Sequence, residues 1–176
     1  MSSRRTLRAN FKVEPLGKAH DRAAFSCGVP PLDNYLQKQA GQDVAKHVAV
    51  CFVLTPEGKT VAGYYTLSQY ALDLVELPAE TVKKLPRYPE VPTTLLGRLA
   101  LSERFRGQGL GEFLLLDALY RCLRQSSQVA SAAVVVDAKD ESAKRFYERF
   151  EFVALPGIPN RLFLPMRTIG DLFRDA

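Results

Sequence analysis

The chain has 176 residues, 47% of them hydrophobic, which fits one globular domain spanning residues 1–176 with a core of its own. No apolar run reaches the roughly 18 residues that a membrane-spanning helix needs, so the sequence predicts no membrane partner. The net charge of +5 allows a polyanionic partner, but a charge of this size is also common in proteins that bind no nucleic acid.

The N-terminal stretch MSSRRTLRANF carries arginines without an apolar segment behind them, which argues against a secretory signal. Cys27, Cys51 and Cys122 are widely spaced, with no CxxC motif and no Cys/His pair. This spacing argues against a disulfide framework and against a zinc site. We therefore expect a cytoplasmic protein without a bound metal.

In the first half of the chain, continuous apolar runs of strand length alternate with segments whose apolar residues have the spacing of a helix. The expected elements are a strand from Phe11 to Leu16, a short helix from Ala19 to Phe25, a break at 27–31, a helix from Leu32 to Ala45, and strands at 48–54 and 61–72. The turn at 55–59 between the last two strands predicts an antiparallel hairpin.

In the second half, four prolines between Leu77 and Pro92 argue against a long regular element there. The expected elements are a short helix near 79–85, a strand at 95–101, a helix at 110–124, a strand at 132–136, a helix at 141–150 capped by Asp140, two short strands at 152–155 and 161–166, and a surface tail or helix from Arg167 to Ala176. This order predicts a mixed α/β fold.

The segment Arg106–Gly111 reads RGQGLG and stands between an expected strand and an expected helix. Such a turn leaves backbone N–H groups pointing outward at a helix N-terminus, where they and the helix dipole favour negative charge. Glycine removes the Cβ that would keep a phosphate away, and it tolerates positive φ. The segment therefore predicts a phosphate or pyrophosphate site; the alternative is a turn that only reverses the chain.

Two common nucleotide-binding motifs do not fit this segment. The P-loop pattern GxxxxGK[ST] is absent, and the GxGxxG pattern fails because Glu112 stands three residues after Gly109. No acidic residue ends a matching second strand about twenty residues further on. The sequence thus argues against a P-loop NTPase and against a dinucleotide-binding fold.

Two motifs instead resemble the GNAT acetyltransferase superfamily. Arg106-x-x-Gly109-x-Gly111 resembles its acetyl-CoA pyrophosphate loop, and residues 140–152 (DESAKRFYERFEF) resemble its N-x-x-A-x-x-[FL]-Y-x-x-x-G-F helix. The resemblance extends over nearly the whole chain to the GNAT toxins of bacterial type II toxin–antitoxin modules, through the segments Phe25–Gly28, Leu32–Leu36, Gly63–Ser68, Leu96–Leu101 and Val136–Asp140. It implies a central, mostly antiparallel sheet of about six or seven strands flanked by about four helices.

The resemblance also implies an activity and partners. Members of this group acetylate the α-amine of the amino acid on charged tRNA, which blocks translation. They form homodimers and are neutralised by a ribbon-helix-helix antitoxin, so that contact with DNA would be only indirect, through the antitoxin. On this basis the acetyl donor is acetyl-CoA and the acceptor is aminoacyl-tRNA.

The same resemblance assigns residues to the cofactor. The backbone of Leu99 to Leu101 would bind the pantetheine arm as an added strand and aim an N–H at the thioester carbonyl. The N–H groups of the glycine loop would hold the pyrophosphate, with the Arg106 charge nearby. The expected cofactor-binding residues are Leu99, Ala100, Leu101, Arg106, Gly107, Gln108, Gly109, Leu110, Gly111, Asp140 and Phe146.

Two positions depart from the second motif. Asp140 stands where the family has Asn; it still caps a helix, but the resemblance supports less strongly a CoA contact that the family makes through the Asn side chain. Glu151 stands where the family has Gly, and it would be strained if that position required a positive φ.

Tyr147 is the candidate general acid. A phenol titrates near 10 and a thiol near 8.5, so this phenol can protonate a departing thiolate. The alternative is an aromatic core residue on an amphipathic helix. His20 and His47 lie in no catalytic motif, and we expect no dedicated base. A free α-amine already titrates near 7.7–8.0, against about 10.4 for lysine, which favours an aminoacyl-tRNA over a protein lysine as acceptor.

Basic residues supply the candidate tRNA contacts. Lys83, Lys84 and Arg87 can release counterions from phosphates, and the neighbouring Tyr88 can stack on a base. Arg98, just before the CoA-binding strand, and Lys38 are further candidates. The alternative for all of them is a solvated basic face. Two other functions also stay open: an acetyltransferase for a small amine or a protein N-terminus, and a non-catalytic CoA-binding partner in a DNA-bound repressor complex.

Overall fold

The computed structural model describes residues 10–174, so most of the arginine-containing N-terminal stretch and the last two residues of the predicted C-terminal tail lie outside it. The chain divides into two compact units. Unit 1 comprises Met1–Ser68 and Gly97–Ala118, and unit 2 comprises Gln69–Leu96 and Leu119–Ala176. The expectation of one domain stays a prediction.

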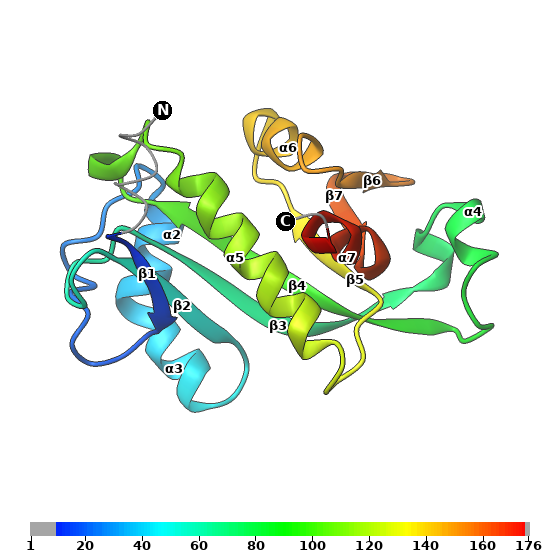
Figure 1. Ribbon diagram of the computed structural model, residues 1–176, viewed down its shortest axis with the longest axis horizontal. Helices are drawn as coiled ribbons and strands as arrows, with labels where there is room; N and C mark the ends of the chain where they lie inside the picture. Colours follow the sequence, from blue (N-terminus) through cyan, green and yellow to red (C-terminus); the bar gives the residue numbers. More distant parts are fainter. Residues whose placement is uncertain (1–9, 175–176) are drawn as a thin grey trace. The chain divides into compact units, whose positions relative to one another are not determined.

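A seven-stranded sheet runs in the order β1-β2-β3-β4-β5-β7-β6 (Figure 1). Its strands are β1 (Lys12–Pro15), β2 (Val50–Thr55), β3 (Gly63–Asp73), β4 (Glu90–Leu101), β5 (Ala133–Asp137), β6 (Val153–Leu155) and β7 (Ile158–Pro165). β4 and β5 pair in parallel, whereas β1–β2, β2–β3, β5–β7 and β6–β7 are antiparallel. The predicted hairpin and the mostly antiparallel mixed α/β sheet are thereby confirmed.

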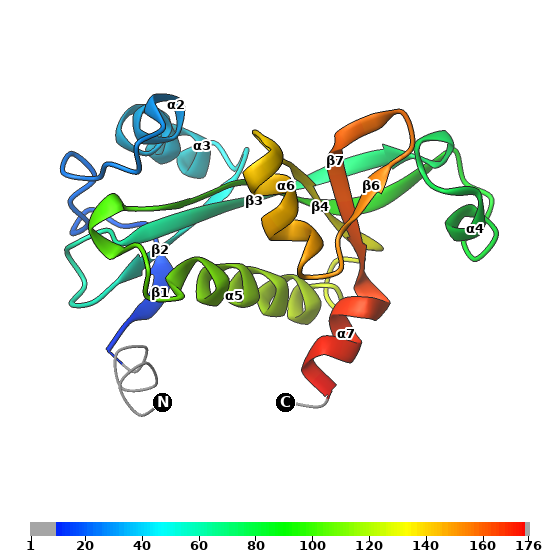
Figure 2. The same ribbon diagram turned by 90° about the horizontal axis from the view of Figure 1, so that it is seen from above.

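In unit 1, helical segments cover both faces of the sheet (Figure 2). α2 (Pro30–Asn34), the π-helical turn η1 (Tyr35–Gln39) and α3 (Ala40–Ala45) follow one another without a break. Their buried side chains pack on the same core as Tyr64 of β3 and Ala100 of β4. The predicted helix at 32–45 is therefore present, but a wider turn interrupts it.

Helix α5 (Leu110–Gln125) begins directly after the glycine loop and lies on the other face of the unit 1 sheet (Figure 2). Leu110, Leu114 and Leu115 are each at most 1% exposed, so the start of the helix is fixed by burial of apolar side chains. The Tyr65 hydroxyl donates a hydrogen bond to Asp117 at 2.7 Å. This packing holds the loop-to-helix junction in place.

Unit 2 is built on β5, whose central residues Val134, Val135 and Val136 are fully buried. Continuous burial on both faces explains why this strand reads as an unbroken apolar run. Around it lie α6 (Glu141–Glu148) and α7 (Met166–Arg174), while α4 (Ala79–Val82) lies in the excursion between β3 and β4 (Figure 1). The short helix expected near 79–85, the helix at 141–150 and a C-terminal helix are therefore present.

Two expectations are wrong in detail. Residues 19–25 form turns and one bridge, Asp21 to Thr60, rather than a short helix. His20 is 8% exposed there: its Nδ1 accepts from the Gly17 N–H at 2.9 Å, and its Nε2 lies 2.7 Å from Glu14. These contacts within the turn replace helical ones. β4 also begins at Glu90, before Pro92, whose carbonyl accepts a hydrogen bond from the Ala132 N–H.

Candidate functional site

The glycine loop belongs to unit 1, and its backbone is accessible from outside. Gly107 has φ +80° and Gly109 has φ +74°, a left-handed conformation that favours glycine. A Cβ added at Gly107 or Gly111 would meet no atom within 4 Å. The N–H groups of Gly107 and Gln108 have no acceptor among residues 10–174. Together with the first turn of α5, these donors form a surface that an anionic group can approach.

Arg106 supports the loop in a way that the sequence did not indicate. Its Nη2 donates a hydrogen bond to the Cys27 carbonyl, and its Nη1 lies 4.0 Å from Glu103. The side chain is 57% exposed. Arg106 therefore connects the loop to the segment before α2 and leaves its charge at the loop surface.

The end of β4 offers an unpaired edge. The parallel ladder with β5 stops at the Leu96–Val136 pair, whereas β4 continues to Leu101. Leu99 and Leu101 are half-buried and Ala100 is buried. The geometry of these three residues thus suits the predicted addition of an extended pantetheine arm to the strand.

Tyr147 lies on α6 in unit 2 and is 7% exposed. Its ring contacts those of Phe146, at a centroid distance of 5.3 Å, and Phe152, at 5.4 Å. No group among residues 10–174 forms a hydrogen bond with its hydroxyl. Burial raises the pKa of Tyr147 above its usual range, so the phenol keeps its proton at any physiological pH.

Asp140 caps α6 as expected. Its backbone is extended, with φ −160°, and its side chain accepts from the Ala143 N–H at 2.8 Å. This hydrogen bond is the main reason why the pKa of Asp140 is lowered. After the helix, Glu151 has φ +70°, so the position where the family has Gly does adopt the left-handed conformation.

The basic segment before β4 belongs to unit 2. Lys83, Lys84 and Arg87 are exposed, and none of them forms an ion pair with another described residue. Tyr88 is 66% exposed. Acidic residues flank them in the sequence at Asp73, Glu76, Glu80 and Glu90, so the segment from the end of β3 to the start of β4 carries mixed charge, with its basic residues gathered at 83–87.

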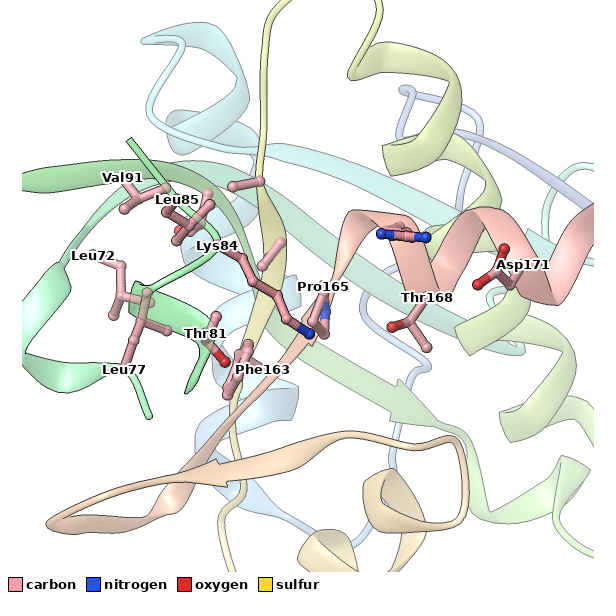
Figure 3. A pocket seen from close by; sticks show the side chains of 14 residues that line it. Leu72, Leu77, Thr81, Lys84, Leu85, Val91, Phe163, Pro165, Thr168 and Asp171 are labelled. Atoms are coloured by element: carbon pink, nitrogen blue, oxygen red, sulfur yellow. The ribbon is translucent and has the colours of Figure 1, made fainter. Parts of the chain in front are cut away.

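Lys84 also borders a cavity of about 560 Å³ in unit 2. Leucines, Val91 and Phe163 form the apolar part of its wall (Figure 3). The Lys84 side chain extends over this wall toward Pro165, and Thr168 and Asp171 of α7 border the cavity (Figure 3). Lys84 is therefore less free to contact nucleic acid than its exposure alone suggests.

In unit 1, Lys38 is exposed on η1, and Arg98 is half-buried against Tyr35. The sequence did not indicate the side chains around Arg98. Tyr35 donates a hydrogen bond to Asp43, which also accepts one from Gln39. In unit 2, Arg161 joins Asp137 to the Tyr70 hydroxyl in the same unforeseen way. No sequence motif links these residues, because folding brings distant positions together.

Three further findings limit the chemistry. Cys27, Cys51 and Cys122 are buried, free thiols, and burial raises the pKa of Cys27 to about 11. Residues 10–174 contain no group of three His, Cys, Asp or Glu side chains that could hold a metal ion. No described helix is both long and apolar enough to cross a membrane.

Comparison with known proteins agrees with these features. A model of the acetyltransferase (GNAT) family matches residues 18–152. The "tRNA-acetylating toxin" of Mycobacterium tuberculosis (strain ATCC 25618 / H37Rv) is 35% identical over 163 residues, which cover 91% of this chain and 95% of that protein. The "Probable toxin TacT" of Sinorhizobium fredii (strain NBRC 101917 / NGR234) is 31% identical, covering 91% and 93%.

Solved structures also resemble the chain over nearly its full length. A mutant of KacT superposes with a TM-score of 0.87 at 30% identity, covering 93% of this chain and 99% of that one. AtaT complexed with acetyl-methionyl-tRNAfMet superposes with a TM-score of 0.84 at 31% identity, covering 93% and 99%. AtaT has also been solved with the C-terminus of the antitoxin AtaR, AtaTR with acetyl-CoA, and KacTA with DNA.

Proposed function

This chain belongs to the acetyltransferase (GNAT) family, and we propose that it is a toxin that transfers acetyl from acetyl-CoA to the α-amine of aminoacyl-tRNA. The observation that carries this proposal is near full-length similarity to a tRNA-acetylating toxin. The structure of AtaT with an acetylated aminoacyl-tRNA supports the same acceptor. Blocking the amine of charged tRNA stops translation, and a cognate antitoxin neutralises the enzyme.

Residues of unit 1 fit the cofactor. The positive-φ glycines and open N–H groups of the loop suit a pyrophosphate, and the unpaired end of β4 suits an extended arm. Acetyl-CoA supplies the acetyl group as a thioester. The N–H groups of Gly107, Gln108, Leu110 and Gly111 would fix the phosphates, while the side chain of Leu110, which is 1% exposed, anchors the helix beneath them.

We assign Tyr147 the role of general acid. Its buried phenol holds a proton that no other described protein group shares. The CoA thiolate that leaves needs a proton on its sulfur, and the hydroxyl of Tyr147 would donate that proton. Phe146 packs against Tyr147 and keeps the ring in one orientation. Asp140 holds the first turn of α6 through the Ala143 N–H.

The acceptor supplies its own neutral amine. An α-amine titrates near 7.7–8.0, and an adjacent ester lowers that pKa further. A sizeable fraction is therefore neutral at cellular pH. This explains how the reaction proceeds without a base from His20, which Glu14 and Gly17 engage in a turn.

We assign Lys38, Lys83, Lys84, Arg87 and Arg98 to the tRNA. Arg98 is the strongest member of this set, because the Tyr35 ring holds its side chain while no described carboxylate pairs with it. Lys83 and Arg87 are exposed and unpaired among the described residues, whereas Lys84 also borders the unit 2 cavity. Phosphate contacts of this kind make affinity fall as the salt concentration rises.

We further propose the cellular setting. Charged tRNA is a cytoplasmic molecule in bacteria, so we expect the enzyme to act there. By family resemblance we expect a homodimer and a ribbon-helix-helix antitoxin that brings the pair to DNA, as KacTA has been solved with DNA.

The decisive experiment incubates the purified protein with labelled acetyl-CoA and charged tRNA. The expected product is N-acetylated aminoacyl-tRNA, identified after nuclease digestion by mass spectrometry. Spermidine and a peptide with a free N-terminus are offered in parallel reactions. Turnover of either of these, without labelled aminoacyl-tRNA, would replace the proposal with a small-amine or protein N-terminal acetyltransferase.

A further inference from the structure

Arg98 is held by an aromatic ring rather than by a carboxylate. Its guanidinium carbon lies 3.5 Å from the centroid of the Tyr35 ring, a distance at which cation and ring attract each other. Among residues 10–174, no hydrogen bond and no ion pair engages this guanidinium. Arginine usually directs its five N–H donors at carboxylates, phosphates or carbonyls. The Arg98 donors therefore stay open to a substrate anion while the side chain is fixed.

The Tyr35 ring is itself fixed firmly. Tyr35 is 6% exposed, and its hydroxyl donates to Asp43 Oδ2 at 2.8 Å. The other carboxylate oxygen of Asp43 accepts from Gln39 Nε2 at 2.9 Å. The Tyr35 ring also lies nearly parallel to that of Tyr64, with 6.3 Å between centroids and 17° between planes. These contacts leave the ring one position beneath Arg98.

The π-helical turn explains how Tyr35 reaches Asp43, eight positions later. In a regular α-helix each residue advances by about 100°, so positions i and i+8 differ by roughly 80° and face different ways. The turn η1 accommodates one extra residue. Asp43 then occupies roughly the place of an i+7 residue, within about 20° of Tyr35. A π turn is rare and is frequently found at functional sites, which suits a role beyond packing.

Charge completes the arrangement. The hydrogen bonds from Gln39 and Tyr35, followed by the charge of Arg98, lower the pKa of Asp43. Asp43 is therefore an anion that attracts Arg98 but does not pair with it. Arg98 keeps its donors, and Asp43 holds Tyr35.

We propose that Tyr35, anchored by Asp43 across η1, is a positioning residue that aims Arg98 at a phosphate of the 3′ end of the charged tRNA. The inference rests on the proposed function. A guanidinium with one face on a ring keeps its N–H edge in a defined plane, which is the geometry that a bidentate phosphate contact requires. Arg98 makes the contact, and Tyr35 acts only through Arg98.

Steady-state kinetics with charged tRNA test this role. Tyr35→Leu and Arg98→Ala should each raise the KM for charged tRNA about tenfold, with little change in kcat. The double variant should be no worse than Arg98→Ala, because the two residues act as one unit. The KM for acetyl-CoA should stay at the wild-type value. Additive losses in the double variant, or an unchanged KM in Tyr35→Leu, would overturn the proposal.

Because Tyr35 is buried, two gentler variants guard against loss of folding. Tyr35→Phe keeps the ring and loses only the bond to Asp43, so its KM should rise less than that of Tyr35→Leu. Arg98→Lys keeps the charge but not the planar group, and its KM should approach that of Arg98→Ala. A wild-type KM in Arg98→Lys would contradict the role of the stacked guanidinium even if Tyr35→Leu does not fold.

Tyr120→Leu is the matched control. The guanidinium carbon of Arg124 lies 5.9 Å from the centroid of the Tyr120 ring, but Tyr120 is exposed on the surface of unit 2. Its kinetics should equal those of the wild type. If the wild-type protein acetylates spermidine or a peptide but no charged tRNA, the proposed function fails. If it acetylates charged tRNA and the Tyr35 series leaves the KM unchanged, only the positioning role fails.

Discussion

The N-termini of α5 and α6 solve the same problem in opposite ways. Every helix starts with N–H groups that have no partner in the helix. At α6 the chain supplies its own partner, since Asp140 accepts from Ala143. At α5 the preceding residues are glycines with positive φ, and a Cβ at Gly111 would meet nothing. One N-terminus is closed by a side chain, whereas the other has open space at Gly107 and Gly111, which is where we propose that the cofactor phosphates bind.

The two regions also differ in how they reach the left-handed conformation. The loop before α5 uses glycine at Gly107 and Gly109, where positive φ carries no strain. The end of the α6 motif uses Glu151 at φ +70°, where a side chain is strained by roughly 1–2 kcal/mol. The difference teaches that this chain has glycine at the positive-φ positions of its proposed phosphate loop, whereas it has a strained side chain at a positive-φ position that only ends a helix.

The largest expected effect is on chemistry at α6. Tyr147→Phe should lower kcat for acetyl transfer by about 10²-fold or more, because general acid catalysis is worth roughly that much. The melting temperature should not fall, since no described group accepts a hydrogen bond from the hydroxyl. Single-turnover kinetics and calorimetry check both parts. Full activity in Tyr147→Phe would show that Tyr147 of α6 is not the general acid.

The open N-terminus of α5 is tested by filling it. Gly111→Ala should raise the KM for acetyl-CoA about tenfold, because a methyl group occupies the approach to the N–H groups. Its stability should be unchanged or slightly higher, since the position is helical and has open space. Gly107→Ala is the comparison, because its φ of +80° adds strain and it should also unfold at a lower temperature. Isothermal titration with acetyl-CoA and thermal unfolding separate the two effects; unchanged affinity in both variants would refute an anion site here.

Relief of strain at the turn after α6 is a smaller effect. Glu151→Gly should stabilise the protein by about 1 kcal/mol, which is the left-handed strain of a non-glycine residue less the extra entropy of glycine in the unfolded chain. Chemical denaturation measures this change. His47 has φ +58° and gives a matched position, at which His47→Gly should act in the same direction. A loss of stability in both variants would mean that contacts of the side chains outweigh the strain.

The smallest effect concerns the cap of α6 at low pH. Because the pKa of Asp140 is lowered in the folded state, mainly by the Ala143 N–H, its contribution is present above the unfolded pKa of about 3.9 and disappears as the pH falls through the folded value. Asp140→Asn keeps a neutral cap, so its melting temperature should fall less between pH 6 and 3 than that of the wild type. Identical acid sensitivity in the two proteins would show that Asp140 does not contribute to the pH dependence.

Much of the fold followed from local patterns. The start of α5, the cap at Asp140 and the hairpin of β2 and β3 each depend on residues within one short window, so periodicity and capping rules found them. The turns around His20 could not be predicted in this way. Contacts of His20 with Glu14 and Gly17 stabilise them instead of a helix, and the spacing of apolar residues does not reveal such contacts. The π turn at Tyr35–Gln39 could not be predicted either, since the hydrogen bond that accompanies it joins Tyr35 to Asp43, eight residues later.

For the candidate site, the sequence by itself determined the glycine loop, the position of Tyr147 and the family that these motifs resemble, because each depends on residue types at fixed spacing. Only the tertiary structure decided what the charged side chains do. It gave Arg106 a carbonyl partner at Cys27, set Arg98 on the ring of Tyr35, and gave Lys84 a cavity wall to cover. Long, flexible cations have no preferred partner until the folded surface brings one within reach, and for that reason no spacing rule could assign them.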